Sequence, residues 1–204
     1  MSDLGYKLTK KILKPIFYKK YEPTVINADV VPKEDPIILC GNHYHVLDQC
    51  GPLFEIPRVV HYMAKKEYFD DFKTRWFFKM VGCISVDREN HEEAKKAKEK
   101  AINILKKGGA IGIFPEGTRN KTDAFLLPFK YGAVSMAQKA DATIVPFAVT
   151  GKYEKGGNLL VRFGEPFKVT DMTKEEANEK LFNVIKTLKE ENLGIKKWSI
   201  LITF

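Results

Sequence analysis

The sequence predicts a single α/β domain with a mostly parallel central sheet flanked by helices, preceded by an N-terminal amphipathic helix. Segments with helical spacing of apolar residues alternate along the chain with short apolar runs that are typical of buried strands. Such alternation indicates a parallel sheet built from strand–helix–strand units. The 204 residues, 44% of them hydrophobic, are enough for one domain with a sizeable core. The sequence shows no internal repeat, linker or low-complexity segment.

Residues 1–20 are predicted to form a basic amphipathic helix, and residues 21–204 the globular domain. At about 100° per residue, the apolar residues and the lysines of this segment fall on different sides of the helix. Pro15 is a position at which such a helix can kink or end. Two interpretations have equal weight: a helix lying in an anionic membrane interface, and a helix packed on the domain with a solvated lysine edge. The two sides hold Leu4, Leu8, Ile12, Ile16, Leu13 and Phe17, and Lys7, Lys10, Lys11 and Lys14, respectively.

Short apolar runs bounded by turn residues predict the strands. An alternating run near the end of the chain is expected to pair antiparallel with the long strand before it. The apolar tail, Trp198 to Phe204, is interpreted as a final strand or as a segment that docks on the core or on a membrane. The predicted strands are 24–31 at a sheet edge, 37–40, a strand around Val59-Val60, 83–86, 110–114, 143–149 and 159–163.

Helical spacing and capping residues predict the helices. In two places an Asn or Thr is followed three residues later by a Glu, which is the pattern of a capping box at a helix start. Glycines mark two of the helix ends. Apolar positions 69, 72, 76 and 80 keep helical spacing in an aromatic, basic stretch. The predicted helices are one that begins near Asp48, 67–81, one from Asn90 to Gly108-Gly109, 129–140, and one from Thr173 to Gly194.

The formal net charge is +8 and the sequence pI is about 9.2. A basic protein favours anionic partners such as nucleic acid, acidic lipid or phosphorylated substrates. The three cysteines are few, and their number is odd. This argues against a disulfide framework and indicates a reducing compartment. The sequence lacks a secretory signal and any uncharged apolar window long enough for a transmembrane helix. We therefore expect a soluble or peripheral protein.

Three turns directly after predicted strands carry reactive or charged side chains. The first holds His43 and Asp48, five positions apart; the second holds Asp87-Arg88; the third is the run 116–119, Glu-Gly-Thr-Arg. A histidine held by a carboxylate is a general-base arrangement. Five residues on a helix would put the two side chains about 140° apart, so the chain between His43 and Asp48 must turn for them to meet.

These turns are expected to form one site, because ligands in open α/β sheets gather beyond the carboxyl ends of the strands. The site would contain a base, a carboxylate, two arginines suited to bidentate phosphate binding, and a glycine that lets main-chain N–H groups approach a ligand. No serine or cysteine is paired with the base in the sequence. The nucleophile is therefore interpreted as the substrate's own hydroxyl.

A metal site is the competing interpretation of the first turn. Cys40, His43, His45 and Cys50 lie close together in the sequence and are residue types that bind zinc. The spacing lacks the second ligand pair of a zinc finger, so no metal is expected. His45 is expected to have a structural role or to line the pocket.

Four short blocks along residues 36–150 carry a resemblance to a known family. In this order they match the four blocks of the glycerolipid acyltransferases, and the chain resembles the 1-acyl-sn-glycerol-3-phosphate (lysophosphatidate) acyltransferase type. Ser85 and Phe147 depart from the residues usual in the family, which affects the expected acyl-chain preference. The blocks are Asn42-His43-x4-Asp48, Gly82-x-Ile84-x-Val86-Asp87-Arg88, the run Phe-Pro-Glu-Gly-Thr-Arg at 114–119, and Ile144-Val145-Pro146, followed in similarity by Phe129-Lys130-x-Gly132.

The resemblance implies the glycerolipid acyltransferase fold and a transfer of an acyl group from acyl-CoA or acyl-carrier protein to the sn-2 hydroxyl of lysophosphatidate. The product would be phosphatidic acid. His43 would act as the base and Asp48 would orient it. No cofactor or metal is implied, and the protein would be peripheral, on the cytoplasmic face of the cell membrane. The implied substrate-binding residues are Arg88, Arg119 and Lys130 for the phosphate, Gly117 and Thr118 as hydrogen-bond donors, and Glu116 beside an arginine or a glycerol hydroxyl.

Three alternatives stay open beside this hypothesis. The acceptor could be glycerol 3-phosphate or another lysolipid, because the motifs are shared across the family. A basic nucleic-acid-binding module would use the lysines and the aromatic stretch 68–78, but lysine is spread along the chain and no binding motif stands out. No nucleic-acid partner is therefore expected. A membrane-bound scaffold with a degenerate site conflicts with the presence of His43, Asp48 and Glu116.

Overall fold

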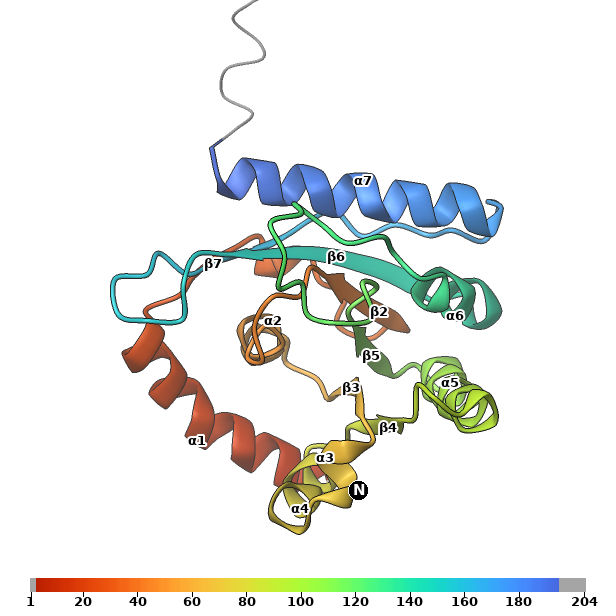
Figure 1. The fold of residues 1–204 in the computed structure, drawn as a ribbon, viewed down its shortest axis with the longest axis horizontal. Helices are drawn as coiled ribbons and strands as arrows, with labels where there is room; N and C mark the ends of the chain where they lie inside the picture. The colour runs from red at the N-terminus through yellow and green to blue at the C-terminus, as the bar shows by residue number, and fades with distance from the viewer. Residues whose placement is uncertain (1–2, 195–204) are drawn as a thin grey trace, which may run out of the picture.

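The computed structural model describes residues 3–194. Seven strands form one sheet in the order β1-β7-β6-β2-β5-β3-β4 (Figure 1). Every neighbouring pair is parallel except β6 and β7, which are antiparallel as predicted. The mostly parallel α/β sheet is thereby confirmed. The strands are β1 (Thr24–Ile26), β2 (Ile37–Gly41), β3 (Val60–Lys65), β4 (Ile84–Val86), β5 (Ala110–Ile113), β6 (Thr143–Thr150) and β7 (Leu160–Phe163).

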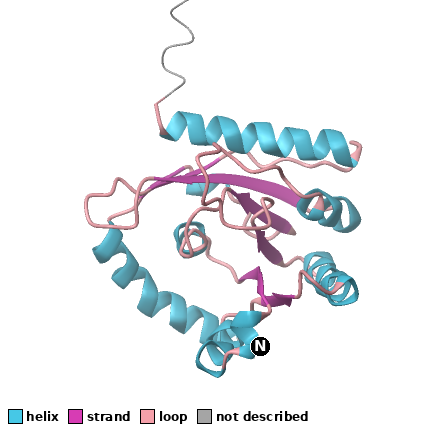
Figure 2. Ribbon diagram, in the orientation of Figure 1, coloured by secondary structure: helices cyan, strands magenta, loops and turns pink. Residues whose placement is uncertain are grey.

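Helices cover both faces of the sheet (Figure 2). One buried cluster joins α5, α6 and α7 to the sheet, and a second joins α1 and α2 to its other face. The helices are α1 (Asp3–Tyr21), the 3-10 helix η1 (Ala28–Val30), α2 (Cys50–Glu55), α3 (Glu67–Asp70), α4 (Phe72–Met80), α5 (His91–Lys106), α6 (Gly132–Ala140) and α7 (Lys174–Asn192).

Strand β2 shows why the sequence contains continuous apolar runs. Ile38 and Cys40 pack toward α5, α6 and α7, whereas Ile37 and Leu39 pack toward α1 and α2. Side chains alternate across a strand, so a strand buried on both faces must be apolar at every position. The predicted buried strand over 37–40 is confirmed as β2, which extends to Gly41 and places the next residue, Asn42, at the edge of the core.

The predicted helix starts after Asn90 and at Thr173 are confirmed. Thr173 and Glu176 form a reciprocal capping box at α7. At α5 the Asn90 side chain accepts hydrogen bonds from the second and third main-chain N–H groups of the helix. Glu93 does not complete a second capping box there, because its carboxylate pairs with Lys96 at 2.7 Å.

The predicted helix over 67–81 is two helices, α3 and α4. Asp71 separates them, and its side chain accepts a hydrogen bond from the main-chain N–H of Lys73 to begin α4. The apolar stripe expected there is also wrong in part, because Phe72 and Trp76 are 72% and 61% exposed.

Two further elements are shorter than predicted by three residues or more. The edge strand over 24–31 ends at Ile26, because Asn27 has a left-handed φ of 58° and begins η1. The helix expected from residue 129 begins at Gly132. The tail from Trp198 to Phe204 lies outside the described residues.

Helix α1 has two different apolar sides and runs through Pro15 without ending there. Tyr6, Phe17 and Tyr21 are buried against the domain. The opposite stripe is exposed: Leu8 by 56%, Ile12 by 52% and Ile16 by 58%. The packed interpretation therefore holds for one side of the helix, and an exposed apolar stripe remains on the other. None of the helices described between residues 3 and 194 combines the length and apolar composition needed to cross a membrane.

Candidate active site

The three turns singled out in the sequence border one cavity. They follow β2, β4 and β5, which run parallel within the sheet, so their carboxyl ends lie on the same side of it. The cavity lining includes His43 from the first turn and Arg88 from the second, and Gly117, Thr118 and Arg119 come from the third. The expected convergence of the three turns is confirmed.

Asp48 holds His43 through a buried hydrogen bond. The distance from His43 Nδ1 to Asp48 Oδ2 is 2.8 Å, and Asp48 is fully buried. The same oxygen accepts the main-chain N–H groups of Tyr44 and His45, each at 2.7 Å. The other oxygen, Oδ1, accepts the hydroxyl of Tyr153 at 2.8 Å. The turn between His43 and Asp48 therefore wraps around the carboxylate, as the five-residue spacing required.

The His43 ring is fixed in an orientation suited to a general base. Because Nδ1 faces the carboxylate, it carries the proton, and Nε2 is the nitrogen left for a substrate. One face of the ring stacks on Phe114, with ring centroids 4.0 Å apart and planes 9° apart. The side chain is 17% exposed and lines the cavity.

Glu116 fixes the main chain of His43. Its Oε1 accepts the His43 N–H at 2.7 Å, and its Oε2 accepts the Leu127 N–H at 2.8 Å. The carbonyl of His43 in turn accepts the Asn120 N–H at 2.6 Å. Glu116 is only 3% exposed, and burial raises its pKa while the two amide hydrogen bonds oppose that rise. Each oxygen of Glu116 thus accepts one main-chain N–H, and its expected position beside an arginine or a substrate hydroxyl stays a prediction.

Gly117 shapes the third turn. It has φ of +70°, and an added Cβ would lie 2.9 Å from Cδ and Cε of Lys130. Its N–H bonds the Phe114 carbonyl at 3.0 Å, so the glycine is needed for its conformation, and its N–H is already used within the turn. Lys130 lies against this turn but not in the cavity lining, whereas Thr118 is part of that lining.

Cationic side chains border the cavity near His43. Arg88 and Arg119 were predicted there, and Lys121 joins them. Within residues 3–194, the side chains of these three make no hydrogen bond or close ion pair to a protein group, although the charge of Arg88 contributes to lowering the pKa of Glu67. Lys121 was not predicted, because it lies in a polar loop after the third block and belongs to no motif.

The cavity is large, and its lining is mostly apolar away from these cationic side chains. Its volume is about 820 Å³, and it extends from His43 to the inner side of α1 and to α4. The buried hydroxyl of Tyr62 has no hydrogen-bond partner among the described groups. Side chains from several elements give the cavity its apolar wall, among them Leu13, Leu47, Leu53, Phe54, Met63 and Phe77.

The four residues of the zinc interpretation do not converge. Cys40 is fully buried in the core shared with α5, α6 and α7, whereas His43 and Cys50 line the cavity on the other face. His45 Nδ1 accepts the Leu47 N–H at 3.2 Å. Within residues 3–194, no group of three or more His, Cys, Asp or Glu side chains is arranged to hold a metal ion.

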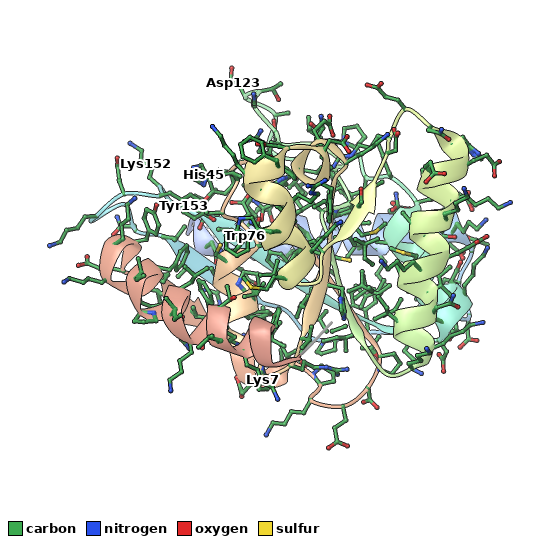
Figure 3. All side chains as sticks on the ribbon, turned by 90° about the horizontal axis from the view of Figure 1, so that it is seen from below. Lys7, His45, Trp76, Asp123, Lys152 and Tyr153 are labelled. Atoms are coloured by element: carbon green, nitrogen blue, oxygen red, sulfur yellow. The ribbon has the colours of Figure 1, made fainter. Side chains whose placement is uncertain are left out.

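Asn42 and Tyr153 support the first turn through contacts between residues that are far apart in the sequence. The Asn42 side chain bonds both the carbonyl and the N–H of Val149, at 2.9 and 2.8 Å, and so continues the pairing of β2 with β6. Tyr153 stacks on His45, with ring centroids 4.1 Å apart (Figure 3). No role was predicted for Asn42 or for Tyr153 from the sequence.

The cavity, the His43–Asp48 pair and the cationic rim on this fold define a group-transfer enzyme, and the sequence pattern of the acyltransferase family matches residues 22–150. The chain belongs to the acyltransferase family. The predicted resemblance is thereby confirmed.

Two bacterial relatives extend this result. The chain is 31% identical over 191 residues to the 1-acyl-sn-glycerol-3-phosphate acyltransferase of Bacillus subtilis, covering 91% of this chain and 94% of the relative. It is 32% identical over 186 residues to the protein of the same name from Streptococcus pneumoniae, covering 84% and 67%. The crystal structure of the 1-acyl-sn-glycerophosphate (LPA) acyltransferase PlsC from Thermotoga maritima has the same fold, with a TM-score of 0.75 at 23% identity over 95% of this chain and 81% of that one.

Proposed function

We propose that this acyltransferase transfers a fatty acyl group from a thioester to the sn-2 hydroxyl of 1-acyl-sn-glycerol 3-phosphate, giving phosphatidic acid. The observation that carries the proposal is the His43–Asp48 pair at 2.8 Å, whose histidine lines a largely apolar cavity together with two arginines. Those three parts correspond to the base, the acyl chain and the phosphate of the reaction. The names of the Bacillus and Streptococcus relatives support this choice of acceptor.

In the proposed reaction His43 Nε2 takes the proton of the glycerol hydroxyl as that oxygen attacks the thioester carbonyl carbon. The ester carbon–oxygen bond forms, the carbon–sulfur bond breaks, and the leaving thiolate takes the proton from the imidazolium. Asp48 stabilises the imidazolium through Nδ1. A positioned base of this kind typically contributes about 10²–10⁴-fold to the rate.

Arg88 and Arg119 would bind the phosphate of the acceptor. Guanidinium groups form paired hydrogen bonds to phosphate oxygens, and both arginines line the cavity close to the turn of His43. Thr118 would add a hydroxyl donor. Lys121, also in the lining, and Lys130 beside Gly117 would add positive charge. Glycerol 3-phosphate carries the same phosphate, so these residues alone do not favour one acceptor over the other.

The apolar cavity would hold the acyl chain of the donor. Its wall of Leu, Phe and Met side chains offers an environment that stabilises a chain by about 0.8 kcal/mol per buried CH₂. The donor is acyl-CoA or acyl-carrier protein in this proposal. Because the thioester brings the activated acyl group itself, the reaction needs no further cofactor.

We also propose that the protein is peripheral, on the anionic cytoplasmic face of the cell membrane. Leu8, Ile12 and Ile16 form an exposed apolar stripe on α1, beside the exposed lysines Lys7 and Lys11. Phe72 and Trp76 are exposed on α4, which lines the same cavity as the N-terminal half of α1. Apolar and aromatic side chains with nearby lysines suit a lipid–water interface.

The test is a thiol-release assay with purified protein, lysophosphatidate and acyl-CoA, repeated with glycerol 3-phosphate and with acyl-carrier protein. We expect turnover with lysophosphatidate, and His43→Ala should lower kcat by about 10²-fold or more while the circular dichroism spectrum stays unchanged. His91→Ala, an exposed histidine at the start of α5, is the control and should retain wild-type turnover. Absence of turnover with every substrate pair would refute the proposed function.

A further inference from the structure

The two oxygens of Asp48 have different partners. Oδ2 accepts three hydrogen bonds from the first turn: from His43 Nδ1 and from the main-chain N–H groups of Tyr44 and His45. Oδ1 accepts the Tyr153 hydroxyl at 2.8 Å. Asp48 is fully buried, so without Tyr153 the oxygen Oδ1 would lose the donor that solvates it. A buried carboxylate oxygen without a donor is costly.

Tyr153 is itself held rigidly. It lies in the connection between β6 and β7, outside the four sequence blocks. Its ring stacks on His45 at 4.1 Å and meets the ring of Tyr44 at 5.9 Å. On its other side the rings of Phe17 and Tyr21 from α1 approach edge-on, at 6.4 and 5.6 Å. The hydroxyl is therefore aimed at Asp48 by contacts to the first turn and to α1 together.

The Tyr153 hydroxyl is a hydrogen-bond donor at the pH values at which the enzyme would work. Burial, together with the negative charge of Asp48, raises its pKa far above the ordinary value for tyrosine. The phenol thus keeps its proton, and that proton lies on the bond to Oδ1.

We propose that Tyr153 is a positioning residue for the acyl transfer, acting through Asp48 on His43. This inference rests on the proposed function. Tyr153 fixes the carboxylate so that Oδ2 stays on His43 Nδ1, and it disperses part of the negative charge of Asp48. Groups that orient a catalytic or ligating histidine in this indirect way typically matter by about 10–100-fold in activity.

Removing the Tyr153 hydroxyl should change the pH dependence of the reaction, which loss of a purely structural contact would not do. With one donor fewer, the Asp48 carboxylate attracts the Nδ1 proton more strongly and stabilises the imidazolium form of His43. His43 must be neutral to accept a proton from the acceptor hydroxyl. The acid limb of the pH profile of kcat/KM should therefore move to higher pH in the variant.

The experiment compares Tyr153→Phe with Tyr18→Phe. Tyr153→Phe keeps the four ring contacts and removes only the hydroxyl. Tyr18→Phe is matched, because the Tyr18 hydroxyl also bonds a carboxylate, that of Glu55, which does not line the cavity. We expect Tyr153→Phe to lower kcat by roughly 10-fold with little change in the KM for lysophosphatidate, and to shift the acid limb upward. Tyr18→Phe should leave the kinetics unchanged.

A second measurement separates failure of this inference from failure of the proposed function. The ring of His43 is titrated by NMR in the wild type and in Tyr153→Phe. The signal is assigned by its loss in His43→Asn. The titration midpoint should rise in Tyr153→Phe whether or not lysophosphatidate is the acceptor. An unchanged midpoint, or wild-type kcat with an unmoved acid limb, would overturn the role of Tyr153. Absence of turnover in the wild type, with a raised midpoint in the variant, would overturn only the proposed substrate.

Discussion

The carboxylate of Glu116 lies 2.7 Å from the main-chain nitrogen of His43. Through this contact the third turn, after β5, determines where the first turn, after β2, presents its histidine. The second oxygen of the carboxylate binds the Leu127 N–H, which ties the polar loop 120–128 to the same point. Glu116 thus ties its own turn to two other segments by hydrogen bonds to their main chain, at a position closed to solvent.

The first prediction follows from this arrangement. Glu116→Gln keeps one carbonyl acceptor but turns an amide NH₂ toward one of the two N–H donors. A buried donor left without an acceptor costs about 1–3 kcal/mol, so urea unfolding should show a loss of that size. We expect kcat to fall, because His43 moves with its main chain, and the KM for the acceptor to change little. Glu99→Gln, at an exposed position of α5, is the control.

The opposite kinetic pattern would show direct substrate contact by Glu116. In that case the KM for lysophosphatidate would rise in Glu116→Gln, while kcat and the free energy of unfolding stayed near the wild-type values.

Arg119 should act mainly on acceptor binding. It lines the cavity, and charged hydrogen bonds contribute about 1.5–3 kcal/mol each, so Arg119→Ala should raise the KM for lysophosphatidate roughly 10-fold or more. Arg119→Lys, which keeps the charge but loses the paired donors, should give an intermediate KM. Steady-state kinetics measure both. Lys106→Ala, exposed on α5, controls for loss of positive charge. An acceptor KM unchanged by Arg119→Ala would remove this residue from the phosphate site.

The exposed stripe on α1 should be needed for membrane binding but not for folding. The triple variant Leu8→Ser, Ile12→Ser, Ile16→Ser should lose most co-sedimentation with anionic vesicles, since burial of each such side chain is worth about 1.5–3 kcal/mol. Its thermal unfolding should change little, because these side chains are more than half exposed. The double variant Tyr131→Ser, Leu193→Ser removes two exposed apolar side chains elsewhere and should still sediment.

Deletion of α1 would not test this prediction. The inner side of the helix contacts Tyr153 through Phe17 and Tyr21 and lines the cavity through Tyr6 and Leu13. A deletion would therefore disturb the fold and the site together. Unchanged sedimentation of the triple variant would place the membrane contact on another surface.

Several of the features predicted correctly from the sequence are local ones. The capping box at Thr173, the two-sided burial of 37–40 and the turn between His43 and Asp48 each depend on residues a few positions apart. Helical spacing also identified an apolar stripe through Phe72 and Trp76, but spacing does not say what covers a stripe, and here nothing in the described chain buries those two side chains.

The residues that support the site could be identified only from the folded structure. Asn42 meets Val149 across 107 positions, and Tyr153 meets Asp48 across 105. No local pattern signals such pairs. The same holds for Glu116, because only the fold shows that its two oxygens accept the main-chain N–H groups of His43 and Leu127.

The last prediction concerns Lys10, on the inner side of α1. Its Nζ donates to the Ile56 carbonyl, and burial, followed by the positive charge of Lys14, lowers its pKa from 10.5 to about 8. Between these two values the unfolded chain binds more protons at this residue than the folded chain does. Stability contributed by this residue therefore rises with pH across that window and is constant below it.

Wild type and Lys10→Met are compared by urea unfolding at a series of pH values below and within that window. The difference in free energy of unfolding should grow in favour of the wild type as the pH rises from about 8 toward 10.5. Lys7→Met, which replaces an exposed lysine of the same helix, is the matched control. Its free energy of unfolding should follow the pH profile of the wild type more closely. Parallel profiles for Lys10→Met as well would mean that the lysine is not desolvated in the folded protein, and that this end of the cavity is open to water.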